Sequence, residues 1–271
     1  GASGGMFGMA HFRELKLRKT NGDSIDLYSI SHADDVAKDL LNPISTTLAL
    51  NDLFIRWQTF KDGNNTYTKD RGFSLERPWN LNTNGMTNKR LKDYTFPEAN
   101  SQIPIMVFSP NILADGRSLY ISSQPSSFLI DPRSDIPGFE QHNSAIEFSR
   151  FFKHQGADDL WFTTALRMNA TFPYISPAVT LPSDPQIEVM DAGFRDTYGT
   201  GTALHYLFTF RNWIASNTSG VLIIQIRDRS KVEPVKDRGS RTVIDQVFDP
   251  LGGIYNNLFQ MQDYQHDMQM A

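Results

Sequence analysis

Apolar and polar positions alternate in helical patterns over the first sixty residues of the chain. Near the start, apolar residues recur at three-residue spacing and a basic cluster follows, which predicts an amphipathic helix with cations at its C-terminal end. The apolar positions of this helix are Met6, Met9, Phe12 and Leu15. Ser31 and Asp34 resemble a capping box that opens a short helix before Pro43, and a further helix is expected over residues 44–57.

Continuous apolar runs further along the chain predict strands. Residues 103–108 and 221–227 form such runs, which are typical of strands buried on both faces. Residues 118–122 are expected to pair with 103–108 as a hairpin, and residues 187–190 form a further short strand. Helical stretches separate the strands, so we expect right-handed crossovers and a mostly parallel, helix-covered sheet in an α/β fold.

The remaining segments complete a single expected domain over residues 1–271. A helix opened by Asn143 and two more helices, over 158–168 and 202–215, are predicted from apolar spacing. Residues 61–88 are rich in Asn, Gly, Lys and Asp, which indicates long surface loops. The weakest seam is expected near residues 229–240, and residues 230–271 are expected to form a C-terminal helical extension.

Composition and charge narrow the classes of function. Of the 271 residues, 39% are hydrophobic and 12% aromatic, which suffices for a sizeable core and excludes disorder as the main state. The net charge is -4 and no basic run is present, so a nucleic-acid partner is not expected. The absence of Cys excludes a thiolate nucleophile. No aliphatic stretch approaches the length of about 18 residues that a membrane span requires.

The first five residues, Gly1-Ala2-Ser3-Gly4-Gly5, match the G-x-S-x-G pattern of a nucleophile elbow. Small residues on either side of the serine allow a sharp turn into a helix, and that turn exposes the hydroxyl at the N-terminus of the helix. A flexible glycine-rich terminus would have the same residues, and the pattern alone does not distinguish such a terminus from a nucleophile elbow.

A second candidate lies at the end of the strand predicted over residues 187–190. Asp191 follows this strand directly and is followed by Ala192 and Gly193. The carboxyl end of a strand is where α/β folds place their sites. A simple turn or helix cap is the alternative interpretation of an isolated Asp-x-Gly.

Taken in order, these segments resemble the patatin-like phospholipase family. The elbow at Ser3 and the Asp191-Ala192-Gly193 turn carry the resemblance, together with similar segments at residues 70–79, 104–117 and 165–177. The matches extend from residue 1 to about residue 227. The resemblance implies a three-layer α/β/α domain and a lipid acyl hydrolase that uses a Ser-Asp dyad, with no catalytic histidine and no cofactor.

Carried over to this chain, the resemblance makes Ser3 the nucleophile and Asp191 the general base, with an acyl-enzyme on Ser3. Gly1, Gly4, Gly5, Ala192 and Gly193 would support the motifs and the oxyanion. The implied substrate is a fatty acyl ester of a phospholipid or related lipid, met at a membrane or micelle surface.

The chain departs from the family pattern in two places. Ala192 stands where the family has the middle Gly of Asp-Gly-Gly, which matters only if the backbone there needs a positive φ. The family's oxyanion loop and first strand lie upstream of the nucleophile. We therefore expect a fragment that lacks its N-terminal strand and is inactive or weakly active, since one oxyanion donor is worth about 100-fold to 1,000-fold in turnover.

Two alternatives remain open at this point. The order Ser3, Asp191, His205 imitates the triad of an α/β-hydrolase esterase, although a partly buried helix histidine is the simpler interpretation of His205. The other alternative is a non-catalytic lipid-binding or interaction module. No pair among the six histidines has metal-binding spacing along the sequence, so no metal site is expected.

Overall fold

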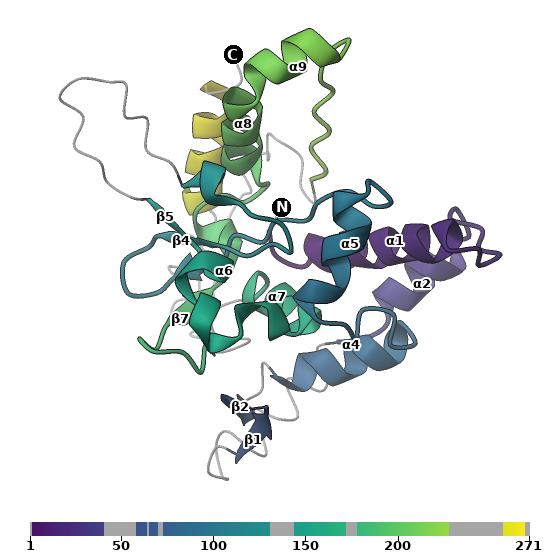
Figure 1. Cartoon of the computed structure of the whole chain (residues 1–271), viewed down its shortest axis with the longest axis vertical. Coiled ribbons are helices and arrows are strands. Elements are labelled where there is room, and N and C mark those ends of the chain that lie inside the picture. Colours follow the sequence, from purple (N-terminus) through teal and green to yellow (C-terminus); the bar gives the residue numbers. More distant parts are fainter. Residues whose placement is uncertain are drawn as a thin grey trace, which may run out of the picture. The chain divides into compact units, whose positions relative to one another are not determined.

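The computed structural model describes residues 2–40, 58–63, 65–69, 73–130, 144–171, 178–227 and 257–268. The chain divides into two compact units, Gly1–Ala192 and Gly193–Ala271, and contains both helices and a mixed sheet (Figure 1). The helix expected over residues 44–57, the start of the helix expected at Asn143 and the seam expected near residues 229–240 lie outside the described residues.

The first unit is built on a sheet of five short strands. Along the sheet these are β5 (Ala145–Glu147), β4 (Ser118–Tyr120), β3 (Asn111–Ile112), β7 (Glu188–Met190) and β6 (Val179–Thr180). Only β4 and β5 run parallel, while the other three neighbouring pairs are antiparallel. The expectation of a mostly parallel sheet is therefore wrong for the described strands. The physical reason is the connections: β3 and β4 are joined by a tight turn through Gly116, at φ 73°, rather than by a helical crossover.

The strand expected over residues 103–108 is displaced along the chain. Only Phe108 takes part in pairing, through reciprocal backbone hydrogen bonds of 2.9 Å with Ile121, and the strand proper follows as β3. The predicted hairpin with residues 118–122 is confirmed in this shifted register, in which Asn111 pairs with Ser118. On its other side Asn111 pairs with Met190, and this register brings β3 beside the end of β7.

Six α-helices of the first unit are described, and 3-10 turns connect several of them. They are α1 (Gly5–Thr20), α2 (Ser31–Ala37), α4 (Glu76–Asn82), α5 (Thr95–Ala99), α6 (Phe148–Phe151) and α7 (Phe162–Met168). Both α2 and α5 lie against α1 (Figure 1). The predicted helix over residues 158–168 is thus confirmed only from Phe162, because residues 157–159 form a 3-10 turn.

Helix α1 ends at Thr20, after the predicted basic cluster, but its buried face matches the prediction only in part. Met6 and Leu15 are buried as predicted, whereas Met9 and Phe12 are 54% and 49% exposed. The buried face instead follows the helical repeat through residues 7, 10, 11, 14 and 17, and it includes His11 and Glu14. Polar side chains therefore occupy positions that a pattern of apolar residues cannot identify.

A β-hairpin replaces part of the surface loop expected over residues 61–88. Strands β1 (Gln58–Asp62) and β2 (Asn65–Lys69) pair antiparallel, and the rings of Phe60 and Tyr67 stack at 5.3 Å on the hairpin. Helix α4 follows after a 3-10 turn. The loop expectation is wrong for these described residues. Each strand has a single aromatic residue among polar ones, so the alternation of apolar and polar positions that predicts a strand is too weak to detect.

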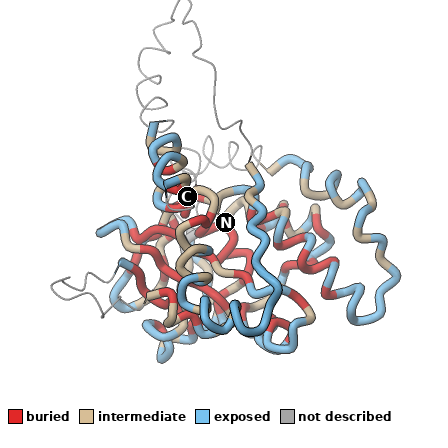
Figure 2. Tube along the Cα trace, turned by 90° about the horizontal axis from the view of Figure 1, so that it is seen from above, coloured by how far each residue is buried: buried red, intermediate tan, exposed pale blue. Residues whose placement is uncertain are grey.

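The core of the first unit forms where α1, α4, α7 and the sheet meet. Its largest fully buried side chains include Trp79, Tyr94, Phe108 and Phe162, and the rings of Tyr94 and Phe162 approach to 4.6 Å. Figure 2 shows buried residues in red in the interior and exposed residues at the turns. The Arg13 guanidinium crosses this core to the carboxylate of Glu98 on α5, and so ties α5 to α1.

The second unit contains α8 (Thr200–Thr209), α9 (Arg211–Asn217) and a helix over residues 257–268. The single helix expected over residues 202–215 is interrupted at Phe210. Residues 221–227 have no regular secondary structure, and Leu222 and Ile226 are more than 80% exposed. The expected buried strand is therefore wrong, because no described strand pairs with this segment. Of the C-terminal helical extension expected over residues 230–271, residues 257–268 are helical and the others lie outside the described residues.

Candidate active site

Ser3 stands at the entrance of α1 in a strained backbone conformation. Its φ is 55°, in the left-handed region that residues with a Cβ rarely adopt. The Ser3 carbonyl accepts a hydrogen bond from the N–H of Met6 at 3.1 Å, so the first helical turn begins at the serine itself. Ser3 is half-buried and Gly4 and Gly5 are exposed. This sharp turn into a helix N-terminus has the backbone shape of a nucleophile elbow.

Asp191 follows β7 directly, as the sequence predicts, and is 1% exposed. Its N–H donates to the carbonyl of Thr171 at 3.2 Å, and its carbonyl accepts from the Asn111 side-chain amide at 3.0 Å. Asn111 belongs to β3, whose pairing with β7 holds it at this place. The carboxyl end of β7 is thus fixed from two directions.

One backbone carbonyl joins the two candidate residues. The oxygen of Asn169, the residue that ends α7, accepts hydrogen bonds from the N–H of Ser3 at 3.0 Å and from the N–H of Ala192 at 3.5 Å. The backbone of Ser3 and the backbone next to Asp191 therefore lie within two hydrogen-bond lengths of each other. The structure brings together two residues that are 188 positions apart in the sequence.

Three polar residues of this neighbourhood were not expected from the sequence. Asn169 is completely buried, and its side-chain oxygen accepts the N–H of Ser109 at 2.8 Å. Ser109 and Asn111 are also buried, at 4% and 3% exposure. None of the three belongs to a motif with recognisable spacing, since each contributes through a hydrogen bond to a distant segment. The only local signal is that all three lie in segments of the resemblance, Ser109 and Asn111 in 104–117 and Asn169 in 165–177.

The remaining predicted site residues divide between the two units. Gly1 lies outside the described residues. Ala192 is completely buried and is not among the described residues with positive φ, so its departure from glycine brings no backbone strain. Gly193 and His205 belong to the second unit, where the carbonyl of His205 accepts the Thr209 hydroxyl. The triad alternative with His205 remains a prediction.

A cleft of about 630 Å³ lies elsewhere in the first unit, between the β1–β2 hairpin, α4 and α7. Neither Ser3 nor Asp191 lines it. On its wall a buried ion pair joins Arg167 of α7 to Glu76 of α4 at 2.7 Å, and the Thr164 hydroxyl donates to the same carboxylate. Because Glu76 and Arg167 form an ion pair with each other, we treat this pair as a structural link between the two helices.

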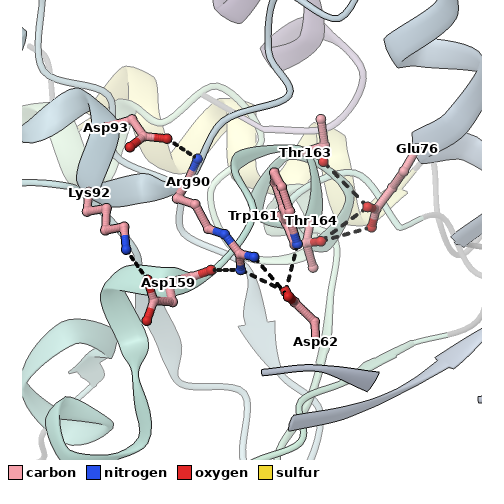
Figure 3. A network of polar contacts seen from close by, with 9 residues as sticks. All are labelled: Asp62, Glu76, Arg90, Lys92, Asp93, Asp159, Trp161, Thr163 and Thr164. Carbon is pink, nitrogen blue, oxygen red and sulfur yellow. Dashed lines mark hydrogen bonds and ion pairs between the residues drawn. The ribbon is translucent and has the colours of Figure 1, made fainter. Parts of the chain in front are cut away.

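A second polar network borders the same cleft, and Figure 3 shows it beside the hydrogen bonds of Thr163 and Thr164 to Glu76. Arg90 donates twice to the carboxylate of Asp62, at 2.7 and 2.8 Å, and its guanidinium lies 3.9 Å above the ring of Trp161. The indole N–H of Trp161 donates to Asp62 as well. The hydrogen bonds from Arg90 lower the pKa of Asp62 below its ordinary value, which keeps this carboxylate charged and attaches the hairpin to the rest of the unit.

Residues able to hold a metal ion occur together at one place in the described part of the chain. His11, His32 and Asp35 present ligand atoms within 4.8 Å of one another, from α1 and α2. They contribute nothing to the junction of Ser3 and Asp191.

No helix among the described residues is both long enough and apolar enough to cross a bilayer. Comparisons with protein-family models, with curated proteins and with solved structures found no match to this chain. The interpretation of the site therefore depends on the geometry of Ser3, Asn169 and Asp191 and on the sequence motifs that led to them.

Proposed function

We propose that this chain carries the site of a serine acyl hydrolase, with the weak activity expected from the sequence, in which Ser3 is the nucleophile and Asp191 the general base. The observation that carries the proposal is the shared carbonyl of Asn169, which holds the strained Ser3 turn and the end of β7 together. Two motifs that are weak separately support each other once they meet at one atom.

The conformation of Ser3 supports its role as nucleophile. Strained backbone positions cluster at functional sites, where the surrounding structure holds them in place. The turn leaves Ser3 half-buried at the N-terminus of a sixteen-residue helix, where the partial positive charge of the helix dipole favours a developing oxyanion. The N–H of Gly4, directly after the serine, is at the position from which an oxyanion donor acts in such elbows.

Asp191 supports the dyad through its burial. A carboxylate is a weak base toward an alcohol, so the reaction depends on proximity and on exclusion of water rather than on matched pKa values. In the proposed reaction Asp191 takes the Ser3 proton as the Ser3 oxygen attacks the ester carbonyl. The alcohol leaves with that proton and an acyl-enzyme remains. Asp191 then takes a proton from water, which attacks the acyl-enzyme, and returns that proton to the Ser3 oxygen as the fatty acid is released.

The substrate class comes from the sequence resemblance, and we propose a fatty acyl ester of a phospholipid or related lipid. Such a substrate is presented at a membrane or micelle surface. The exposed apolar residues Met9 and Phe12, on the first three turns after Ser3, are compatible with contact to such a surface.

The proposal is tested with a fluorophosphonate probe, read by intact-mass spectrometry and peptide mapping. We expect one covalent adduct on Ser3, lost in Ser3→Ala. We also expect hydrolysis of a nitrophenyl ester to fall about 100-fold to 10,000-fold in Asp191→Asn, the range for loss of a general base. Asparagine keeps the size of the buried side chain while it removes the basic oxygen.

Ser101 supplies a matched control because it is exposed and has nearly the same φ, at 56°. Ser101→Ala should label as the original chain does. A folded chain that does not label at Ser3 contradicts the proposal. Labelling at Ser3 that survives in Asp191→Asn but disappears in His205→Ala would instead favour the triad alternative.

A further inference from the structure

The side chains of His11, His32 and Asp35 form a compact cluster between α1 and α2. Their ligand atoms lie within 4.8 Å of one another. His32 and Asp35 are three residues apart on α2 and so share one helix face, while His11 comes from the buried face of α1. The three possible metal ligands therefore come together only when α1 and α2 pack against each other.

His11 is the most informative member because its ring nitrogens are buried without hydrogen-bond partners. It is 2% exposed, and neither of its ring nitrogens has a hydrogen-bond partner among the described residues. Buried polar groups in folded proteins nearly always have a partner. The neighbouring Trp79 cannot provide one, because its indole N–H donates to the Thr87 hydroxyl at 2.8 Å.

The ring of His32 is oriented by a backbone contact. Its Nε2 lies 2.8 Å from the carbonyl oxygen of Asp26, and a carbonyl only accepts, so Nε2 carries the proton. In a neutral imidazole this leaves a lone pair on Nδ1. Metal-binding histidines almost always donate their second ring N–H to a carbonyl or carboxylate in this way.

Asp35 supplies the negative charge of the cluster. One of its oxygens accepts from Lys38 at 2.7 Å, and a carboxylate has a second oxygen with lone pairs to spare. Glu14 lies one turn after His11 on α1, but its carboxylate already forms an ion pair with Lys89 and accepts a hydrogen bond from the Tyr94 hydroxyl at 2.9 Å. Asp35 is therefore the carboxylate available to the two histidines.

We propose that His11, His32 and Asp35 bind a divalent transition-metal ion of the Zn²⁺ type. Two imidazoles and one carboxylate suit such an ion, and three protein ligands leave a position for water on the half-buried side of His32 and Asp35. This revises the expectation drawn from sequence spacing, which placed no metal site in the chain.

The distances are compatible with closure around an ion. Ligand atoms stand about 2 Å from Zn²⁺, so neighbouring ligands in a tetrahedron are roughly 3.3 Å apart, and no pair has to close by more than about 1.5 Å. His32 and Asp35 lie on a short helix whose Val36 packs against the core. A small movement of this helix toward α1 supplies that closure and keeps the buried His11 and the contact of His32 with Asp26 in place.

The metal would act as a clamp between α1 and α2 and not as part of the hydrolase site. His11 follows Ser3 by eight positions, and a helix rises about 1.5 Å per residue, so roughly 12 Å separate them along α1. An ion at that distance does not polarise a carbonyl bound at Ser3. The metal proposal therefore stands independently of the proposed function.

The test titrates Zn²⁺ into the tag-free, chelator-treated chain in competition with a chromophoric chelator. We expect saturable 1:1 binding, at least about tenfold weaker in His32→Ala and in Asp35→Asn. Asp34→Asn, exposed on the same helix, and His154→Ala, an exposed histidine elsewhere, should bind as the original chain does. Zn²⁺ should also raise the unfolding temperature of the original chain more than that of Asp35→Asn.

Substitution of Co²⁺ provides a spectroscopic readout, since its visible bands report nitrogen and oxygen ligands in a low-symmetry site. Both ligand variants change only half-buried residues, and circular dichroism in chelator confirms that each is folded before titration. Absence of saturable binding overturns the proposal. Equal affinity in Asp35→Asn and Asp34→Asn does so as well, because it would locate the ion away from this cluster.

Discussion

At the scale of single residues, the left-handed backbone conformation of Ser3 lowers the stability of the folded chain. A residue with a Cβ in the left-handed region costs about 1 to 2 kcal/mol, whereas glycine adopts this region without that penalty. We expect Ser3→Gly to exceed Ser3→Ala in free energy of unfolding by about 1 kcal/mol, measured by urea denaturation. Both variants should lose the fluorophosphonate adduct.

Ser101 allows the same comparison away from the proposed site, because its φ is 56°. Ser101→Gly and Ser101→Ala should differ by a similar amount while Ser3 still labels. Equal stability of the two Ser3 variants would show that Ser3 is not held in the left-handed region. If Ser3→Gly raises the free energy of unfolding while it removes the nucleophile, stability and activity have opposite requirements at this turn.

Residues with local signatures could be predicted from the sequence, and residues that act through distant contacts could not. Ser3 was identified by its glycine neighbours and Asp191 by the apolar strand before it. Asn169 acts through its carbonyl, a group that every residue has. His11 is distinguished only by burial and by the arrival of α2 beside it.

At the scale of elements, the ion pair between Glu76 and Arg167 joins α4 to α7 with side chains only 9% and 7% exposed. Loss of one partner of a buried pair costs about 3 to 5 kcal/mol, because the other charge stays buried. We expect Glu76→Ala to lower the free energy of unfolding by an amount in this range, measured by chemical denaturation.

The pair of Lys92 and Asp159 is the matched control, because it is more than half exposed on both sides. Exposed pairs contribute about 0 to 1 kcal/mol, so Lys92→Met should have a small effect. If the two substitutions cost the same, Glu76 and Arg167 are not buried together.

Helices were predicted more reliably than strands, and length is the reason. Helix α1 presents four turns of periodicity and a basic end, which suffice to locate it. Strands β3 and β6 have two residues each, too short for any alternation. The hairpin of β1 and β2 was missed because its residues are mostly polar, and its aromatic pair becomes visible only when the strands are paired.

At the scale of the whole molecule, the most apolar segment of the sequence is not part of a core. Leu222 and Ile226 are 83% and 81% exposed. We expect Leu222→Asp to change the free energy of unfolding by less than about 0.5 kcal/mol, as for ordinary surface positions. Denaturation monitored by tryptophan fluorescence measures this change.

Leu119 is the comparison, because it is completely buried in β4. Leu119→Asp introduces a charge into the core and should lower the free energy of unfolding by more than about 3 kcal/mol, or prevent folding. A comparable loss in Leu222→Asp would restore the original expectation of a buried strand at residues 221–227.

The mixture of helix and sheet could be predicted from the order of apolar patterns, but strand direction could not. Direction depends on whether the chain between two strands turns tightly or crosses over, and two glycine-containing connections can look alike in sequence. The turn through Gly116 reverses the chain between β3 and β4, and this alone removes one parallel pair. The division at residue 192 left no signal in composition either.

The carbonyl of Asn169 has a consequence for how this chain tolerates change. An amino-acid substitution replaces a side chain and leaves the main-chain oxygen present, so a replacement at residue 169 affects the bond that aligns Ser3 with the end of β7 only when it moves the main chain, for example through loss of the hydrogen bond from Ser109 to the Asn169 side chain. Insertion or deletion of one residue between α7 and β7 would move that oxygen. Among related sequences, we expect the position of Ser3 relative to the end of β7 to survive many amino-acid substitutions, but not insertions or deletions between α7 and β7.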